Sequence, residues 1–149
     1  MDVGTLVARS MRRYRDRIAV EGPEGSMTYG EIGSRIFQLA RALKNLGLAE
    51  GDRVLDLQSN QNTYIETDLG ISSAGLCRVA LNYRLHPTDW VRITKDCGAK
   101  TLILDAKFWD DAAPVRELVD TIIVIKGDHP GAHNYENRSE EHTSELQSR

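Results

Sequence analysis

Cysteines and long hydrophobic runs are both scarce in this sequence of 149 residues. Its two cysteines, Cys77 and Cys97, form no CxxC motif, so neither a disulfide scaffold nor a zinc knuckle fits the chain. We expect both thiols to be reduced, small core residues of a cytoplasmic protein. No apolar run approaches the roughly 18 residues that a transmembrane helix needs, so we expect no transmembrane segment.

An excess of basic residues is also missing. Lysine and arginine number 19 against 22 aspartates and glutamates, giving a formal net charge of −3. A chain of this charge has little to neutralise a phosphate backbone, so no nucleic-acid partner is expected. The hydrophobic fraction of 40% and charged fraction of 28% are typical of a globular protein, and the length suits one domain.

The first seventeen residues are nevertheless rich in arginine, which raises the question of a targeting peptide. They also include two aspartates, and no apolar leader segment or small-residue cleavage site follows them. Leu6, Val7, Met11 and Tyr14 recur at helical spacing. We therefore interpret this stretch as an ordinary amphipathic first helix.

The clearest helix signal lies at Thr28 and Glu31, which have the spacing of a capping box. Met27 and Ile32 fit a hydrophobic staple around that cap, and Gly47 is placed to end the helix in a left-handed conformation. Hydrophobic periodicity predicts further helices within residues 1–17 and at 60–74, 87–97 and 108–119, the last restarting at Pro114.

Strands are predicted at 17–21, 26–28, 53–57, 77–81, 101–104 and 121–125. The first two flank a Pro23/Gly25 turn and could form a hairpin. The runs 101–104 and 121–125 are nearly all apolar and β-branched, which is typical of strands buried on both faces. The alternation of strands with helices predicts an α/β fold: a partial doubly wound, mostly parallel sheet with helices on both faces.

Nucleotide-binding motifs are absent from the sequence. Gly70 and Gly75 have the glycine spacing of a P-loop, but Leu76 and Cys77 replace its lysine and hydroxyl residue. We interpret this stretch as a loosely packed helix ending. No GxGxxG fingerprint is present either, which argues against a dinucleotide-binding oxidoreductase.

Few residues suggest catalysis or metal binding. His129 and His133 could supply metal ligands, but Pro130 predicts a flexible loop and no third strong ligand stands nearby, so a solvated loop is the preferred interpretation. His86 precedes Pro87 and is interpreted as a helix cap.

Two aspartates lie in or after predicted strands. Asp105 follows a buried strand, where ligands of doubly wound sheets bind, although a capping role is the preferred interpretation. Asp56 lies inside an apolar strand and could be unburied, paired or protonated.

An ordered series of short motifs resembles one family. The series comprises residues 27–32 (MTYGEI), 39–43 (LARAL), 46–47 (LG), 51–54 (GDRV), Asn60 with Glu66, 74–75 (AG), 80–87 (ALNYRLHP) and 96–100 (DCGAK), followed by the strand 101–104 (TLIL). In this order and spacing they resemble the start of the adenylate-forming, AMP-binding enzymes, which include the acyl-CoA synthetases. The family has a proline where this chain has Ser59, and apolar residues where it has Asp56.

This resemblance implies an ATP-dependent carboxylic acid–CoA ligase that activates a fatty or related acid through an acyl-adenylate. It also implies ATP, Mg²⁺ and CoA as cofactors of the full-length parent, with a small carboxylic acid as substrate. The family's Pro-Lys-Gly phosphate loop, Thr-Glu pair, ribose-binding Asp and mobile-domain lysine match no position here. The resemblance therefore assigns no catalytic, cofactor-binding or metal-binding residue, and we expect this chain to be inactive alone.

The last twelve residues, 138–149 (RSEEHTSELQSR), contain one large apolar residue, Leu146. They resemble the translation of a common sequencing adapter. We therefore expect a truncated synthetase/ligase domain at 1–137 and a non-native tail at 138–149, with the gene continuing past this point. The alternatives are a genuine polar tail and a stand-alone, non-catalytic α/β binding module.

Overall fold

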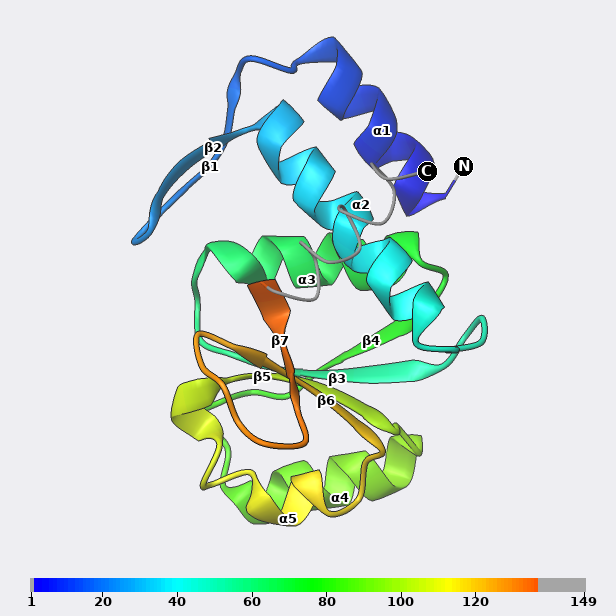
Figure 1. Cartoon of the computed structure of the whole chain (residues 1–149), viewed down its shortest axis with the longest axis vertical. Coiled ribbons are helices and arrows are strands. Elements are labelled where there is room, and N and C mark those ends of the chain that lie inside the picture. The colour runs from blue at the N-terminus through cyan, green and yellow to red at the C-terminus, as the bar shows by residue number, and fades with distance from the viewer. Residues whose placement is uncertain (1, 137–149) are drawn as a thin grey trace.

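The computed structural model describes residues 2–136, which form two sheets and their flanking helices (Figure 1). The helices are α1 (Val3–Arg13), α2 (Tyr29–Asn45), α3 (Asn62–Ser73), α4 (Pro87–Cys97) and α5 (Ala113–Arg116), with a 3₁₀ turn, η1, at Ala106–Phe108. The strands are β1 (Ile18–Gly22), β2 (Gly25–Thr28), β3 (Arg53–Leu57), β4 (Cys77–Ala80), β5 (Thr101–Asp105), β6 (Thr121–Ile125) and β7 (His133–Asn134).

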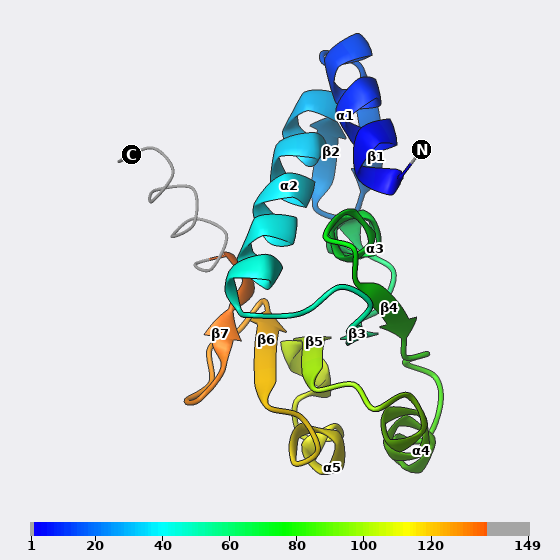
Figure 2. The same ribbon diagram turned by 90° about the vertical axis from the view of Figure 1, so that its right-hand side faces the viewer.

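The larger sheet has the strand order β4-β3-β5-β6-β7, and every pair in it is parallel. Parallel neighbours need crossover connections, which α3 and α4 provide around β4. Helices α2 and α3 cover one face of this sheet and α4 and α5 the other (Figure 2). The predicted α/β class, with a parallel sheet between two helical layers, is confirmed.

The central strands are buried on both faces, as their apolar composition predicts. In β3, Val54 packs in the core under α2 and α3, while Leu55 packs against α4. In β5, Ile103 and Leu102 divide between the same two cores, and all five residues of the strand are buried. Because successive side chains of a strand point to opposite faces of the sheet, these strands contribute to a separate hydrophobic core on each face.

The helix and hairpin signals at the amino-terminal end are also confirmed. The Glu31 amide donates to Thr28 Oγ1 at 3.2 Å, and the Thr28 amide donates to Glu31 Oε1 at 3.1 Å, which completes the capping box of α2. Gly47 follows the end of α2 with a φ of 86°, a left-handed conformation that glycine adopts without a steric penalty. Strands β1 and β2 pair as an antiparallel hairpin.

Two expected elements differ from the structure. The helix predicted at 108–119 is much shorter than expected: the chain forms η1 and then the four-residue α5, although α5 does begin beside Pro114, where a restart was predicted. Pro114 lacks an amide donor, so it is tolerated in the first turn of a helix but not in the interior of a longer one. The predicted loop around His133 contains the short strand β7, which pairs with β6 although neither of its residues favours strands.

Two packing expectations also need correction. Cys77 is not a core residue: it is exposed at the start of edge strand β4, whereas Cys97 is half-buried against the α4 core. The end of α3 that contains Gly70 is not loosely packed, because a Cβ at Gly70 would lie 2.8 Å from Leu39 Cδ2. Gly70 is required for the close approach of α3 to α2.

No helix within residues 2–136 combines the length and apolarity needed to cross a lipid bilayer.

Candidate functional site at the carboxyl edge of the sheet

Polar side chains gather where β3, β5 and β6 end. Because these strands are parallel, their carboxyl ends lie at one edge of the sheet, where ligands of doubly wound folds bind. Lys107 follows β5 and donates from Nζ to Ser59 Oγ, which follows β3, at 2.6 Å. Lys126 follows β6, and its Nζ donates to Gln61 Oε1 at 2.7 Å and to Glu24 Oε1 at 2.9 Å.

The hairpin β1–β2 is attached to this edge through its turn. The Asn62 amide donates to Glu24 Oε2 at 3.3 Å, and Asn62 Nδ2 donates to the Gly25 carbonyl at 3.0 Å. Glu24 thus accepts from Lys126 and from the first residue of α3. These contacts lower the pKa of the Glu24 carboxyl, chiefly through the hydrogen bond from Lys126.

A cleft of about 500 Å³ lies beside the end of β6, between the hairpin, α2 and α3. Arg35 of α2 and Glu66 of α3 lie in its wall. Arg35 Nε is 2.9 Å from Glu66 Oε2, and Arg35 Nη1 donates to Glu136 Oε2 at 3.0 Å. Burial lowers the pKa of Arg35, but hydrogen bonds to the two carboxylates outweigh it and raise the pKa overall.

Glu66 is also held by Tyr135, whose hydroxyl donates to Glu66 Oε1 at 2.8 Å. Both residues are almost fully buried, at 1% and 2% exposure. Burial, followed by the charge of Glu66, raises the pKa of the Tyr135 phenol well above its ordinary value. The tyrosine therefore remains a neutral donor to this carboxylate.

Asp56, whose state the sequence left open, is buried and paired. Its Oδ2 lies 2.8 Å from Arg78 Nε of the neighbouring strand β4. Thr67 Oγ1 donates to the same oxygen at 2.6 Å, and Gln58 Nε2 donates to Oδ1 at 2.6 Å. The carboxylate is fully engaged inside the fold, so it links β3, β4 and α3 and is not available to a substrate.

The other residues considered from sequence have local roles. His86 Nδ1 accepts from the Thr88 amide at 3.1 Å and caps α4, which Pro87 begins, as predicted. Asp105 Oδ1 accepts from the Lys107 amide at 3.0 Å, so its capping interpretation is confirmed.

The two loop histidines are not brought together around a metal. The His129 ring stacks on Trp109 with a centroid separation of 3.8 Å. His133 is exposed in β7. In the described part of the chain, no group of three His, Cys, Asp or Glu side chains could hold a metal ion.

Sequence reasoning overlooked Arg35, Lys107 and Lys126, and it singled out Glu66 only as part of a family motif. Glu66 and Arg35 are on different helices, so no local pattern announces their contact. Lys126 offers one usable signal, because it directly follows a buried strand at the carboxyl edge. It has a φ of 62°, a left-handed conformation rare for a residue with a side chain.

Residues 2–136 do not by themselves fit ATP phosphates or Mg²⁺. The two lysines at the carboxyl edge already donate to Ser59, Gln61 and Glu24. The buried carboxylates Asp56 and Glu66 are each held by an arginine. We therefore derive no catalytic step through a bound nucleotide or metal from these residues.

A sequence model of the AMP-binding enzyme family matches residues 7–148. The match includes 138–148, which lie outside the described residues; their adapter origin stays a prediction. The chain is 34% identical over 93 residues to 3-hydroxybenzoate–CoA ligase of Aromatoleum sp. (strain CIB), covering 62% of this chain and 18% of that protein. It is 34% identical over 101 residues to feruloyl-CoA synthase of an Amycolatopsis species, covering 68% and 21%.

The fold is similar to the crystal structure of the anthranilate CoA ligase AuaEII in complex with anthranoyl-AMP. The TM-score is 0.88 at 23% identity, covering 95% of this chain and 28% of that one. The chain thus spans about a fifth of the length of the two curated relatives. Family match and shared architecture agree: the chain belongs to the AMP-binding enzyme family, as its ordered sequence motifs indicate.

Proposed function

We propose that this chain is the amino-terminal part of an ATP-dependent carboxylic acid–CoA ligase. The observation that supports this most directly is the family match over nearly the whole chain, together with two relatives named as CoA ligases or synthases. The proposed cofactors of the whole enzyme are ATP, Mg²⁺ and CoA. Two free cysteines in the described residues accord with the cytoplasmic location that we propose.

The proposed substrate is a fatty or related carboxylic acid, and the relatives favour an aromatic one. They are named for 3-hydroxybenzoate and ferulate, and the similar crystal structure is that of an anthranilate ligase. Each of these acids contains both a carboxylate and a benzene ring. An aromatic carboxylic acid is therefore the first substrate class to test.

Within the parent, we propose that residues 2–136 act as scaffold. Their buried ionic groups connect strands and helices, and the lysines at the carboxyl edge hold the hairpin and the loop after β3. We assign them no catalytic, cofactor-binding or metal-binding residue. We propose that the chain alone does not form an acyl-adenylate.

Two experiments test the proposal. A long sequencing read through the source locus, past the codon for Asn137, should continue in frame into a Ser/Thr/Gly-rich loop that ends in Pro-Lys-Gly. A genuine stop codon there, with the tail encoded in the genome, would contradict it and favour a non-catalytic α/β module.

The second experiment is biochemical. Pyrophosphate exchange is measured with the purified chain and with the protein encoded by the complete locus, using benzoate, 3-hydroxybenzoate, ferulate and octanoate. We expect exchange for the complete protein only, with the aromatic acids ahead of octanoate. Acid-dependent exchange by the 149-residue chain would refute the scaffold role.

A further inference from the structure

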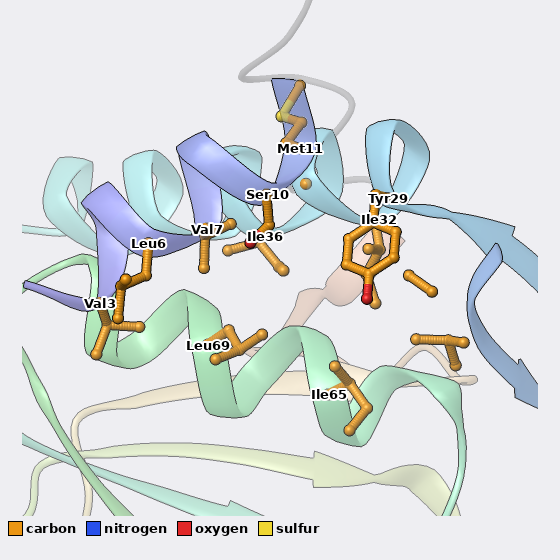
Figure 3. A pocket seen from close by; sticks show the side chains of 13 residues that line it. Val3, Leu6, Val7, Ser10, Met11, Tyr29, Ile32, Ile36, Ile65 and Leu69 are labelled. Atoms are coloured by element: carbon orange, nitrogen blue, oxygen red, sulfur yellow. The ribbon is translucent and has the colours of Figure 1, made fainter. Parts of the chain in front are cut away.

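A second cavity lies away from the carboxyl edge, between α1, α2 and α3. This groove has a volume of about 420 Å³ and an almost entirely apolar lining. Val3, Leu6 and Val7 of α1 face Leu69 and Ile65 of α3 across it, with α2 behind (Figure 3). Nothing in the proposed ligase chemistry uses this groove.

Exposed apolar side chains cluster at the same place. Leu6 is 49% exposed and Ile65 is 39% exposed, and both line the groove. Within residues 2–136, these are two of the four large hydrophobic residues classed as exposed, the others being Ile18 and Leu85. Such clustering on a water-soluble surface indicates a contact region.

Helix α1, which forms one wall of the groove, and the residues that follow it are strongly basic. Residues 2–17 contain two aspartates and five arginines, a local net charge of +3 in a chain of net charge −3. All five arginines are exposed, and none forms an ion pair within the described residues: Arg9, Arg12, Arg13, Arg15 and Arg17. Neither burial, nor an ion pair, nor a catalytic role therefore accounts for the positive charge of these five arginines.

Helix geometry places charge and apolar surface side by side. Leu6, Arg9 and Arg13 are three and seven positions apart, so they share one strip of α1. Acidic residues also adjoin the groove lining: Asp2, Glu21, Glu31 and Asp68 each stand next to a lining residue in sequence. Asp2 and Glu31 are hydrogen-bonded in helix caps, and Asp68 lies 3.7 Å from Arg78. The mouth of the groove thus combines unpaired guanidinium groups with exposed aliphatic side chains.

We propose that α1 and the groove mouth form a peripheral docking surface for a membrane that contains anionic lipids. Charge complementarity selects the partner, because unpaired arginines attract lipid phosphates. Leu6 and Ile65 supply apolar side chains that can contact the acyl-chain boundary of a membrane and that a nucleic acid would not use. The surface lies on the bilayer without crossing it. This proposal does not depend on the ligase function.

Vesicle flotation tests the electrostatic part. The 149-residue chain is mixed with phosphatidylcholine vesicles, with or without phosphatidylglycerol, in about 0.1 M or about 1 M salt, where the screening length is about 10 Å or about 3 Å. We expect binding to the anionic vesicles at low salt only. The double variant R9Q/R13Q should weaken partitioning by roughly 25-fold, at about fivefold per arginine.

Matched controls come from the α4 end of the molecule. R84Q/K95Q removes two exposed cations there, and L85Q removes a leucine of comparable exposure, 38% against 49% for Leu6. Both controls should bind like the unmodified chain, whereas L6Q should bind more weakly. Circular dichroism and a thermal melt establish that each variant is folded.

Three outcomes would overturn the proposal. One is equal binding to neutral and anionic vesicles. Another is unchanged binding by R9Q/R13Q. The third is a concentration-dependent dimer in sedimentation that L6Q abolishes while vesicle binding is absent, which would assign the groove to a second copy of the chain.

Discussion

At the scale of single residues, the buried ionic groups show how distant parts of the chain are joined. Asp56 of β3 meets Arg78 of β4, and Glu66 of α3 meets Arg35 of α2 and Tyr135. A buried charge is tolerated only when it is paired and hydrogen-bonded. These residues therefore fix the relative positions of their elements.

Loss of one partner in the Asp56–Arg78 pair is expected to destabilise the chain strongly. The Asp56 side chain is fully buried and that of Arg78 is 13% exposed, so Asp56→Asn removes the nearer counterion of Arg78 and leaves only the half-exposed Asp68, 3.7 Å away. We expect the free energy of unfolding to fall by about 3 kcal/mol in urea denaturation.

A double-mutant cycle separates this coupling from simple damage. D56N/R78M should cost less than the sum of the two single substitutions, because neither charge is then left alone. Arg92→Met is the control, since Arg92 is 70% exposed and pairs only at the surface. It should change stability by no more than about 0.5 kcal/mol. Strict additivity in the cycle would contradict a buried ion pair.

Tyr135 is expected to make stability depend on alkaline pH. Burial and the charge of Glu66 raise the pKa of the Tyr135 phenol in the folded chain. In the unfolded chain a tyrosine phenol has a pKa of about 10. Above that value the unfolded state loses the proton first, so stability that is present below about pH 10 is lost as pH rises. Tyr135→Phe should reduce this slope, as measured by urea denaturation between pH 8 and pH 11. If Tyr135→Phe left the dependence of stability on pH unchanged, Tyr135 would not be the group responsible for it.

At the scale of elements, α2 and α3 are in direct contact, and Gly70 sets their separation. A Cβ at this position would also lie 3.3 Å from the Ile36 carbonyl oxygen of α2. Backbone cannot move as easily as the end of a side chain. The glycine that weakens the helix locally therefore strengthens its packing.

Gly70→Ala is expected to destabilise the chain by up to about 2 kcal/mol. Alanine favours the helix by about 1 kcal/mol, but overpacking against α2 costs about 1–3 kcal/mol. Ser34→Ala on the exposed side of α2 is the control and should be neutral or slightly stabilising. Thermal unfolding of both variants measures the difference. A more stable Gly70→Ala protein would show that the helices do not approach this closely.

At the scale of the whole molecule, the described residues form one hydrophobic core on each face of the parallel sheet. The cores on the two faces draw on residues between Leu39 and Tyr135. The carboxyl-terminal residues 138–149 contain a single large apolar residue. From this composition we expect the segment to add nothing to either core.

Deletion of residues 138–149 is therefore expected to leave the midpoint of thermal unfolding unchanged within about 1 °C, since a change of 1 kcal/mol shifts it by about 2–8 °C in domains of this size range. Differential scanning calorimetry of the chains 1–137 and 1–149 makes the comparison. A loss of several degrees would mean that the tail packs on the domain, against its interpretation as an adapter translation.

Local patterns in the sequence determined the elements that depend on local physics. The capping box at Thr28, the cap at His86 and the buried strand 101–104 follow from hydrogen bonding and hydrophobicity within a few residues. Motif order determined the family. In the region predicted as a helix at 108–119, only the restart at Pro114 is confirmed, because proline suits the first turn of a helix and breaks the interior of a longer one.

Tertiary structure alone decided which distant residues meet. Whether Asp56 is charged and paired depends on Arg78, 22 positions later, and Glu66 is held by Tyr135, 69 positions later. Tertiary structure also decided the strand order and the exposure of Cys77 on an edge strand. It likewise placed the arginines of α1 beside an apolar groove. Sequence periodicity reports which side of an element is apolar, whereas contacts between elements arise only when the chain folds.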